Sequence, residues 1–305
     1  MKIKNKPVKT ICVLLVAFAT IFAFARNTFA DGMFQVSPMN QKISLTPGER
    51  YYGTFKLTNP ATNSRIFYYK TEVKPFYVDD SFTVIYENNG DYNQIVNWIT
   101  VENPTGSVAP NDTEVIKFYI DVPEDAPAGG QYASIMVKSD SSKENDSDLS
   151  IHQEFSISHI IYAEVAGETK RGGDFNELKV PSFMFSGNIK GISTIKNTGN
   201  VHSDATYTLR VFPLFSKEEV YTNEENPTIA NILPGVSRTN VSEWAETPKM
   251  GIFHVIYDVS FEGITKTIDK YVIICPIWLL IVILAIVFLI IIKILFTGKG
   301  EKKEK

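Results

Sequence analysis

The chain has 305 residues, 44% of them apolar and 12% aromatic, and this length suits about two domains. Its net charge of −4 is unevenly spread, because the first thirty residues carry +5 and residues 293–305 carry +3. The region between them, residues 31–292, therefore carries −12. Such an acidic region repels polyanions, so the composition argues against nucleic acid as a partner.

The N-terminus has the three parts of a secretory signal peptide: a lysine-rich start, an apolar stretch over Ile11–Ala25 and a short polar region. Small residues at the −3 and −1 positions predict cleavage after Ala30. Ala23-Phe24-Ala25 offers the same spacing inside the apolar stretch, and an uncleaved anchor is the remaining alternative. Cys12 lies at the start of that stretch, where lipoprotein processing does not use it.

Alternation of apolar and polar residues dominates the region after the signal, and this period is typical of β-strands. Turn sequences such as Thr46-Pro47-Gly48-Glu49 separate the alternating segments. A series of short strands divided by turns predicts an immunoglobulin-like β-sandwich over residues 31–168. The expected strands are Lys42–Leu45, Tyr51–Thr58, Ile66–Val73, Phe82–Tyr86, Val115–Val122, Gln131–Lys138 and His152–Val165.

A polar stretch, Ser139–Ser150, is interpreted as a surface loop of this first domain. Its acids include Asp140, Glu144 and Asp146, and clustered oxygens are what calcium prefers. The stretch has no glycine at the turn position of a calcium loop, which favours a solvated loop. Calcium binding there is left open.

A second alternating region starts after Gly172-Gly173 and predicts another immunoglobulin-like sandwich over residues 169–270. A faint internal repeat supports the division, because LTNPATNSRIFYYKTEV from Leu57 resembles IKNTGNVHSDATYTLRV from Ile195. The expected strands are Phe175–Pro181, Asn188–Lys196, Ala205–Phe212, Glu218–Thr222, Ser237–Val241, Ile252–Phe261 and Thr265–Ile268. The fold class is therefore all-β, with two sandwiches.

The run Tyr271–Ile292 has 22 apolar or nearly apolar residues, enough for a helix to cross a bilayer. Residues 293–305 form a lysine-rich tail, which favours a cytoplasmic C-terminus. The sequence thus predicts a single-pass type I protein of the cell membrane, with residues 31–270 outside. Cys275 lies in this apolar run, so the region outside has no disulfide and depends on its hydrophobic cores.

Local signatures of catalysis are absent from the sequence. There is no Gly-x-Ser-x-Gly, His-Glu-x-x-His or Gly-x-x-x-x-Gly-Lys motif. His152 and His159 are seven residues apart on one predicted strand, so they point to opposite faces and do not share a metal. We expect a protein that is not an enzyme and has no cofactor, metal or small-molecule substrate. An enzyme with a site dispersed over a sandwich is the minor alternative.

Aromatic residues crowd the first domain and offer the best candidates for a binding surface. Exposed tyrosine and tryptophan give large contact areas and stack on sugar rings or protein partners. The alternative is that the outward rings only form cross-strand pairs. The candidate ligand contacts are Tyr68, Tyr86, Tyr92 and Trp98.

The whole arrangement resembles the WxL-interacting proteins of Gram-positive cell surfaces. Phe34-Gln35-Val36-Ser37-Pro38 is similar to that family's opening F-x-V-x-P, and Ile43-Ser44-Leu45-Thr46-Pro47-Gly48 is similar to its L-x-V-x-P-G. The segment between these motifs is shorter here than in the family. The resemblance implies two sandwich domains that bind peptidoglycan, partner surface proteins or host ligands. A broader resemblance to bacterial immunoglobulin-like and chaperone-like domains accounts for the same residues.

Two functional hypotheses follow from the topology, the paired sandwiches and the lack of a catalytic set. The first is a membrane-anchored scaffold of the bacterial envelope that binds a cell-envelope polymer, such as peptidoglycan, or a secreted or surface protein. The second is a chaperone-like assembly factor for surface proteins, which requires an open edge strand in the first domain.

Overall fold

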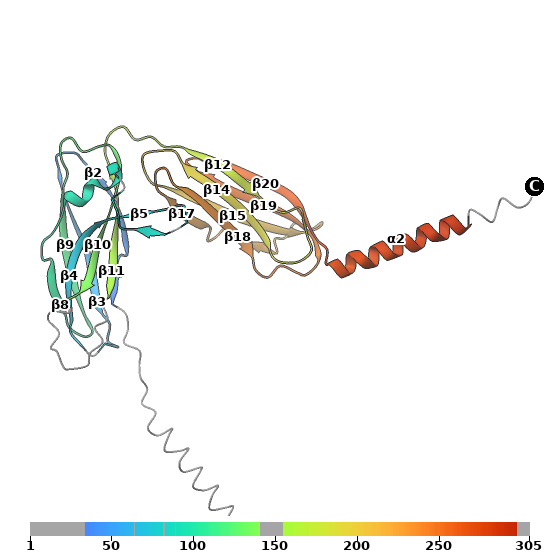
Figure 1. Ribbon diagram of the computed structural model, residues 1–305, viewed down its shortest axis with the longest axis horizontal. Helices are drawn as coiled ribbons and strands as arrows, with labels where there is room; N and C mark the ends of the chain where they lie inside the picture. The colour runs from blue at the N-terminus through green and yellow to red at the C-terminus, as the bar shows by residue number, and fades with distance from the viewer. Residues whose placement is uncertain (1–33, 64, 82, 89, 141–154, 298–305) are drawn as a thin grey trace, which may run out of the picture.

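The computed structural model describes residues 34–297 except 64, 82, 89 and 141–154, and it is mostly β with one C-terminal helix (Figure 1). The predicted cleavage site at Ala30, most of the Ser139–Ser150 loop, His152 and the end of the lysine-rich tail lie outside the described residues.

The first sandwich consists of two sheets that enclose one hydrophobic core. Their strand orders are β1-β3-β9-β7 and β2-β11-β10-β4-β8. Phe55 and Phe118 from the first sheet meet Tyr69, Ile135 and Ile161 from the second in this core. The strands are β1 (Gln35–Ser37), β2 (Asn40–Leu45), β3 (Arg50–Asn59), β4 (Phe67–Pro75), β7 (Ile99–Val101), β8 (Thr105–Val108), β9 (Asp112–Asp121), β10 (Gly129–Ser139) and β11 (Ser156–Val165).

The second sandwich has the same plan, with sheets ordered β12-β14-β18 and β13-β20-β19-β15-β16. Strand β17 pairs with β15 as well. Leu209, Val211, Val255, Tyr257 and Val259 contribute to its core. The strands are β12 (Gly173–Lys179), β13 (Phe183–Met184), β14 (Ile189–Asn197), β15 (Ser203–Pro213), β16 (Tyr221–Thr222), β17 (Thr228–Ile232), β18 (Ser237–Trp244), β19 (Gly251–Phe261) and β20 (Ile264–Ile274).

In both sandwiches the first strand changes sheet at a proline. Strand β1 pairs with β3, and after the cis Ser37–Pro38 bond β2 runs parallel to β11 in the other sheet. Strand β12 likewise pairs with β14, and after Pro181 β13 runs parallel to β20. Proline suits the crossing because it fixes φ and needs no ladder partner.

The internal repeat corresponds to a buried asparagine at the end of β3 and of β14. The Asn59 side-chain amide donates to the carbonyls of Arg65 and Val108, at 2.9 and 3.0 Å. The Asn197 amide donates to the carbonyls of Val201 and Ile232, at 2.7 and 2.8 Å. Each asparagine thus fastens its own turn to the end of a strand across the sandwich, since buried carbonyls need donors.

The helix α2 (Ile277–Thr297) begins later than the sequence pattern predicts. Tyr271–Ile274 belong to β20, where Val272 and Ile274 are buried and pair with β19. Pro276 separates strand from helix, and its carbonyl accepts the first helical bond, from Leu280. The predicted start at Tyr271 is therefore wrong. The window Ile277–Ile294 has a mean hydropathy of 3.3 and is not buried, so α2 is long and apolar enough to cross a membrane.

Buried aromatic and charged groups join the two sandwiches. Tyr132 of β10 packs with His202, at 5.7 Å between ring centroids, and Phe76 and Tyr132 belong to the second core. The buried Arg238 at the start of β18 donates to the carbonyl of Asp79, in the arm formed by β5 (Tyr77–Val78) and β6 (Val84–Ile85). Figure 1 shows β5 reaching toward β17. Burial lowers the Arg238 pKa, and the nearby acids of this arm oppose that shift.

We predict that Asn59→Ala and Asn197→Ala each lower the free energy of unfolding by about 2–3 kcal/mol. Asn197→Ala leaves two buried carbonyls without a donor, and Asn59→Ala leaves one buried and one partly buried carbonyl without a donor. Urea titration of the full chain in detergent measures the change. The exposed Asn226 provides the control, because Asn226→Ala at the surface costs no more than about 0.5 kcal/mol. Equal losses in all three variants would contradict the role of the buried amides.

A second prediction concerns pH and the junction. Burial, helped by Lys42, lowers the His202 pKa to about 4. The folded protein therefore keeps His202 neutral while the unfolded chain binds a proton, so stability falls as pH drops from about 6.5 toward 4. We expect His202→Gln to lessen the stability lost between pH 7 and pH 5 by about 1–2 kcal/mol, measured by urea titration at both pH values. An unchanged pH dependence would show that His202 does not titrate in this way.

Candidate protein-binding edge

Strand β11 has different neighbours on its two edges. Strand β10 pairs with it along Ser156–Val165, whereas β2 pairs with its other side only along Ile160–Val165. Within the described part of the chain, no strand pairs with the outer side of Ser156–His159. We call this outer side of Ser156–His159 the open edge.

The crossing at Pro38 explains why the cover ends there. Before Pro38 the chain belongs to the opposite sheet, so β2 can begin only at Asn40, opposite Ile160. His159 fixes this point, because its Nδ1 lies 2.8 Å from the Pro38 carbonyl oxygen and its ring stacks on Phe55 at 4.6 Å. Burial lowers the His159 pKa, so the ring is neutral at pH 7 and donates to Pro38 through Nδ1–H.

The main-chain groups of the open edge point outward at alternate residues. The Ile160 amide donates to the Met39 carbonyl at 2.9 Å, so residues of the same parity in β11 direct their N–H and C=O groups away from β10. Ser156 and Ser158 are therefore the residues whose main chain faces an incoming strand. The Ser158 hydroxyl also lies 3.3 Å from the Tyr86 hydroxyl.

A small apolar pocket adjoins the open edge, at the end of the sandwich where β10 ends and β11 begins. Phe34 stacks on Phe67 at 3.6 Å and meets Phe155 edge-on at 6.3 Å. Phe67 is buried, whereas Phe155 is 39% exposed. The pocket is lined by Phe34, Phe67, Val137, Phe155, Ser156 and Ile157. Proteins that bind an extended peptide by strand addition use an open strand edge with neighbouring side-chain pockets.

The long free side of β20 offers a contrast. β13 covers only Ile273 and Ile274 of β20, so among the described residues the outer side from Ile264 to Val272 has no strand partner. This side carries Lys266 and Lys270, and edge lysines are a known defence against strand pairing. The open edge of β11 bears no such charge on Ser156–His159, and it alone of the two lies at the pocket.

The four predicted contact aromatics lie in different places. Tyr86 is exposed on the outer face of the five-stranded sheet beside Ser158, and Tyr68 is half-buried on that face. Tyr92, in the 3₁₀ helix η1 (Gly90–Asn97), packs against the second core. Trp98 is only 8% exposed in the first core, because η1 turns it inward, so it offers little surface to a ligand.

Phe34, Phe67 and Phe155 are pocket residues that the sequence pattern does not single out as contacts. Phe34 was noted only as part of a motif, and Phe155 follows a long polar segment, where a lone aromatic residue at a strand's start is a weak signal. Among the described residues, no group of three or more histidines, cysteines and acids is placed to hold a metal ion. The geometry of this site is that of a binding surface.

Comparisons with known proteins give a fold-level likeness only. No protein-family model matches the chain, and no curated protein matches it. Similar solved structures include the class 5 fimbriae chaperone CfaA, with 13% identity, a TM-score of 0.38 and coverage of 79% of this chain and 99% of that chain. The E. coli chaperone DraB has 13% identity and a TM-score of 0.38, covering 78% of this chain and 97% of its own. A chain from the Salmonella enterica SafA pilin–SafB chaperone complex has 11% identity and a TM-score of 0.37, covering 79% and 98%.

Two aromatic residues of the pocket should differ in how much they contribute to the stability of the fold. Phe67 is 6% exposed, so we expect Phe67→Ala to lower the free energy of unfolding by about 3–5 kcal/mol. Phe155 keeps much of its surface in solvent, so Phe155→Ala is expected to cost less than about 1 kcal/mol. Urea unfolding of both variants measures the difference. A large loss for Phe155→Ala would mean that this ring serves the core.

Proposed function

We propose that this chain is a membrane-anchored binding protein that holds an extended segment of another surface protein at the open edge of β11. In this reading the captured segment becomes an additional strand of the five-stranded sheet. The observation that carries the proposal is the outer side of Ser156–His159, which has no strand partner among the described residues and lies beside an apolar pocket.

The site also defines the chemistry of the captured segment. Ser156 and Ser158 would exchange main-chain hydrogen bonds with it, which gives affinity without sequence preference. Its side chains alternate between the two faces of the sheet. An apolar side chain would reach the small pocket at Phe34 and Phe155, and the opposite face would lie beside Tyr86. The expected partner segment is therefore extended, uncharged and apolar at every second residue.

The position of the edge in the molecule suits this role. Strand β10 runs from the junction at Gly129 toward Ser139, so the pocket lies at the end of the first sandwich that points away from the second. Helix α2 leaves from the far end of the second sandwich (Figure 1). With α2 in the membrane, the edge is presented well away from the bilayer and open to a partner. This arrangement favours the assembly-factor hypothesis over a passive scaffold.

Finer assignments belong to the same proposal. We infer that both sandwiches are immunoglobulin-like, that they lie outside the cell membrane and that the lysine-rich tail is cytoplasmic. Membership of the WxL-interacting family remains a prediction from the sequence motifs. The absence of enzymatic activity is likewise an expectation, consistent with a site built from aromatic rings and main-chain groups.

Peptidoglycan binding has one specific observation in its favour. Tyr52 is 67% exposed on the outer face of β3 and lies opposite Tyr119 of β9, with ring centroids 6.5 Å apart. Such a pair can stack on sugars, although it is also an ordinary cross-strand pair. Retention of the protein by purified cell walls, lost in Tyr52→Ala, would support this second function.

The test of strand capture uses a photo-crosslinking amino acid at position 155 in cells that make the full chain. We expect a discrete adduct with another secreted or surface protein. Ser158→Pro should reduce the adduct at least about tenfold, because proline removes the outward N–H and tolerates an edge position. Mass spectrometry identifies the partner.

Ser158→Ala is the matched control, because it loses the same hydroxyl contact with Tyr86 but keeps the N–H. Its adduct should equal that of the parent chain. The same crosslinker at Ile229, an exposed apolar position on the second sandwich, should give no such adduct. Equal adducts with Ser158→Pro and Ser158→Ala would exclude strand addition at this edge.

A further inference from the structure

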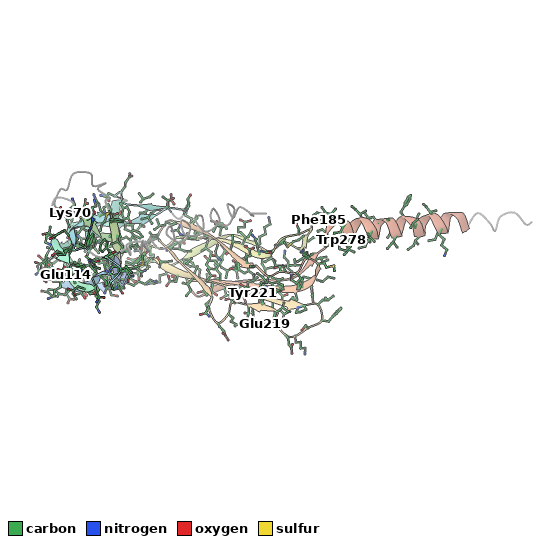
Figure 2. All side chains as sticks on the ribbon, turned by 90° about the horizontal axis from the view of Figure 1, so that it is seen from below. Lys70, Glu114, Phe185, Glu219, Tyr221 and Trp278 are labelled. Carbon is green, nitrogen blue, oxygen red and sulfur yellow. The ribbon has the colours of Figure 1, made fainter. Side chains whose placement is uncertain are left out.

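The end of the second sandwich from which α2 leaves is unusually apolar, and we call it the helix end. Only Cys275 and Pro276 separate β20 from α2. Strand β15 ends here, β19 begins here, and β13 lies beside the last residues of β20. Figure 2 shows Phe185 at this end, close to Trp278 in the first turn of α2.

A row of exposed apolar side chains crosses the outer face of the sheet at the helix end. Phe183 of β13 is the register partner of Ile273 in β20, and Ile273 is the partner of Ile252 in β19. All three are exposed, whereas Phe253, Val272 and Ile274 point into the core. Three adjacent strands therefore present large apolar groups to their surroundings at one level.

The side chains become more polar from row to row along the strands, going away from the helix end. The next row on the same face contains Tyr271, His254 and Phe212, whose neighbouring rings are 5.2 and 5.7 Å apart. In the row after that, Asp269 and Arg210 lie on either side of the half-buried Ile256, and Asp269 lies 2.6 Å from the His254 Nε2 atom. Successive rows are about 7 Å apart.

From row to row, the side chains change from apolar to aromatic and then include charged groups. A bilayer boundary changes in the same direction, from acyl chains to headgroups and water. Tyrosine and tryptophan concentrate at the level of the headgroups in membrane proteins. Tyr271 in the aromatic row matches that level.

Phe215 provides a second, independent observation. It lies in the turn after β15, next to Leu214, whose amide donates to the Ile252 carbonyl at 3.0 Å. Its side chain is 97% exposed, and its backbone has φ +67°, which is unfavourable for a bulky residue. Strained conformations of this kind occur where a side chain serves a contact. Phe215 lies even closer to α2 along the strands than the apolar row does.

We propose that the helix end of the second sandwich is inserted into the boundary between headgroups and acyl chains of the bilayer that α2 spans. Phe183, Phe185, Phe215, Ile252 and Ile273 enter the boundary, and Tyr271 and His254 lie at the headgroups. The proposal rests on the membrane anchoring in the proposed function, and it adds a second lipid contact that fixes the sandwich against the membrane.

The continuity with α2 selects lipid as the occupant of this surface. A two-residue connection keeps the helix end within a few ångströms of the point where α2 enters the bilayer. Charge does not drive the contact, because Lys217 and Lys249 in the adjoining loops are accompanied by Glu218, Glu219 and Glu246. Insertion should therefore occur in uncharged lipid and persist at high salt.

The experiment places a fluorescent reporter at single sites of the full chain in phosphatidylcholine nanodiscs. Cys12 and Cys275 are replaced by serine, and NBD is attached through Phe215→Cys, Ile229→Cys or Leu284→Cys. Position 229 is the matched control, because Ile229 is also an exposed apolar residue, 62% exposed, but lies in β17 at the other end of the sandwich. Position 284 lies within α2 and reports insertion of the helix.

We expect lipids with a nitroxide high on the acyl chain to quench the reporter at 215 by about twofold and the reporter at 229 not at all. Quenching at 284 with none at 215 would overturn this inference and leave the anchor intact. No quenching at 284 would overturn the anchor itself. A signal at 215 that rises with protein density in larger bilayers would show contact between copies of the chain, and would also overturn lipid insertion.

Discussion

The structure depends on a constraint that both sandwiches share: the first strand must serve two sheets. A single strand that pairs with β3 cannot also cover β11, so the chain crosses at Pro38 and covers only part of β11. The buried His159 holds the crossing point in place through its hydrogen bond to the Pro38 carbonyl. In the second sandwich the crossing occurs near the end of β20, so most of that strand stays uncovered on its outer side among the described residues. The same crossing of the first strand thus leaves a short edge without lysine in one sandwich and a long lysine-bearing edge in the other.

Much of this fold could be predicted from residue patterns. Alternation in Tyr51–Thr58, Ile66–Val73 and Val115–Val122 is strong because one face of each strand is buried and the other solvated, and β3, β4 and β9 occur there. The asparagine repeat was visible as sequence, though its role as a buried clamp was not. Strands of two to five residues, such as β1, β7, β8 and β17, were missed because so few residues show no clear period.

Other features depend on tertiary context. An apolar run does not separate a buried strand end from a membrane helix, so Tyr271–Ile274 were predicted as helix although Pro276 marked the boundary. Trp98 was expected at the surface, but η1 turns it into the core. The open edge follows from which strands become neighbours, and no local pattern specifies that. Phe34 and Phe155 are far apart in sequence and meet only after the two sheets have packed.

The packed junction between the sandwiches has a consequence for partner choice. Arg238, Tyr132 and His202 leave the junction filled, and the connection to α2 is only two residues long. A packed junction and a two-residue connection would hold the open edge at one distance from the start of α2. Under the proposed function, a segment carried by another protein would have to come within reach at that distance. The distance of the partner segment from the membrane would then contribute to selectivity, in addition to its side chains. Inserting a flexible spacer at either joint would relax this distance requirement without changing the binding groups.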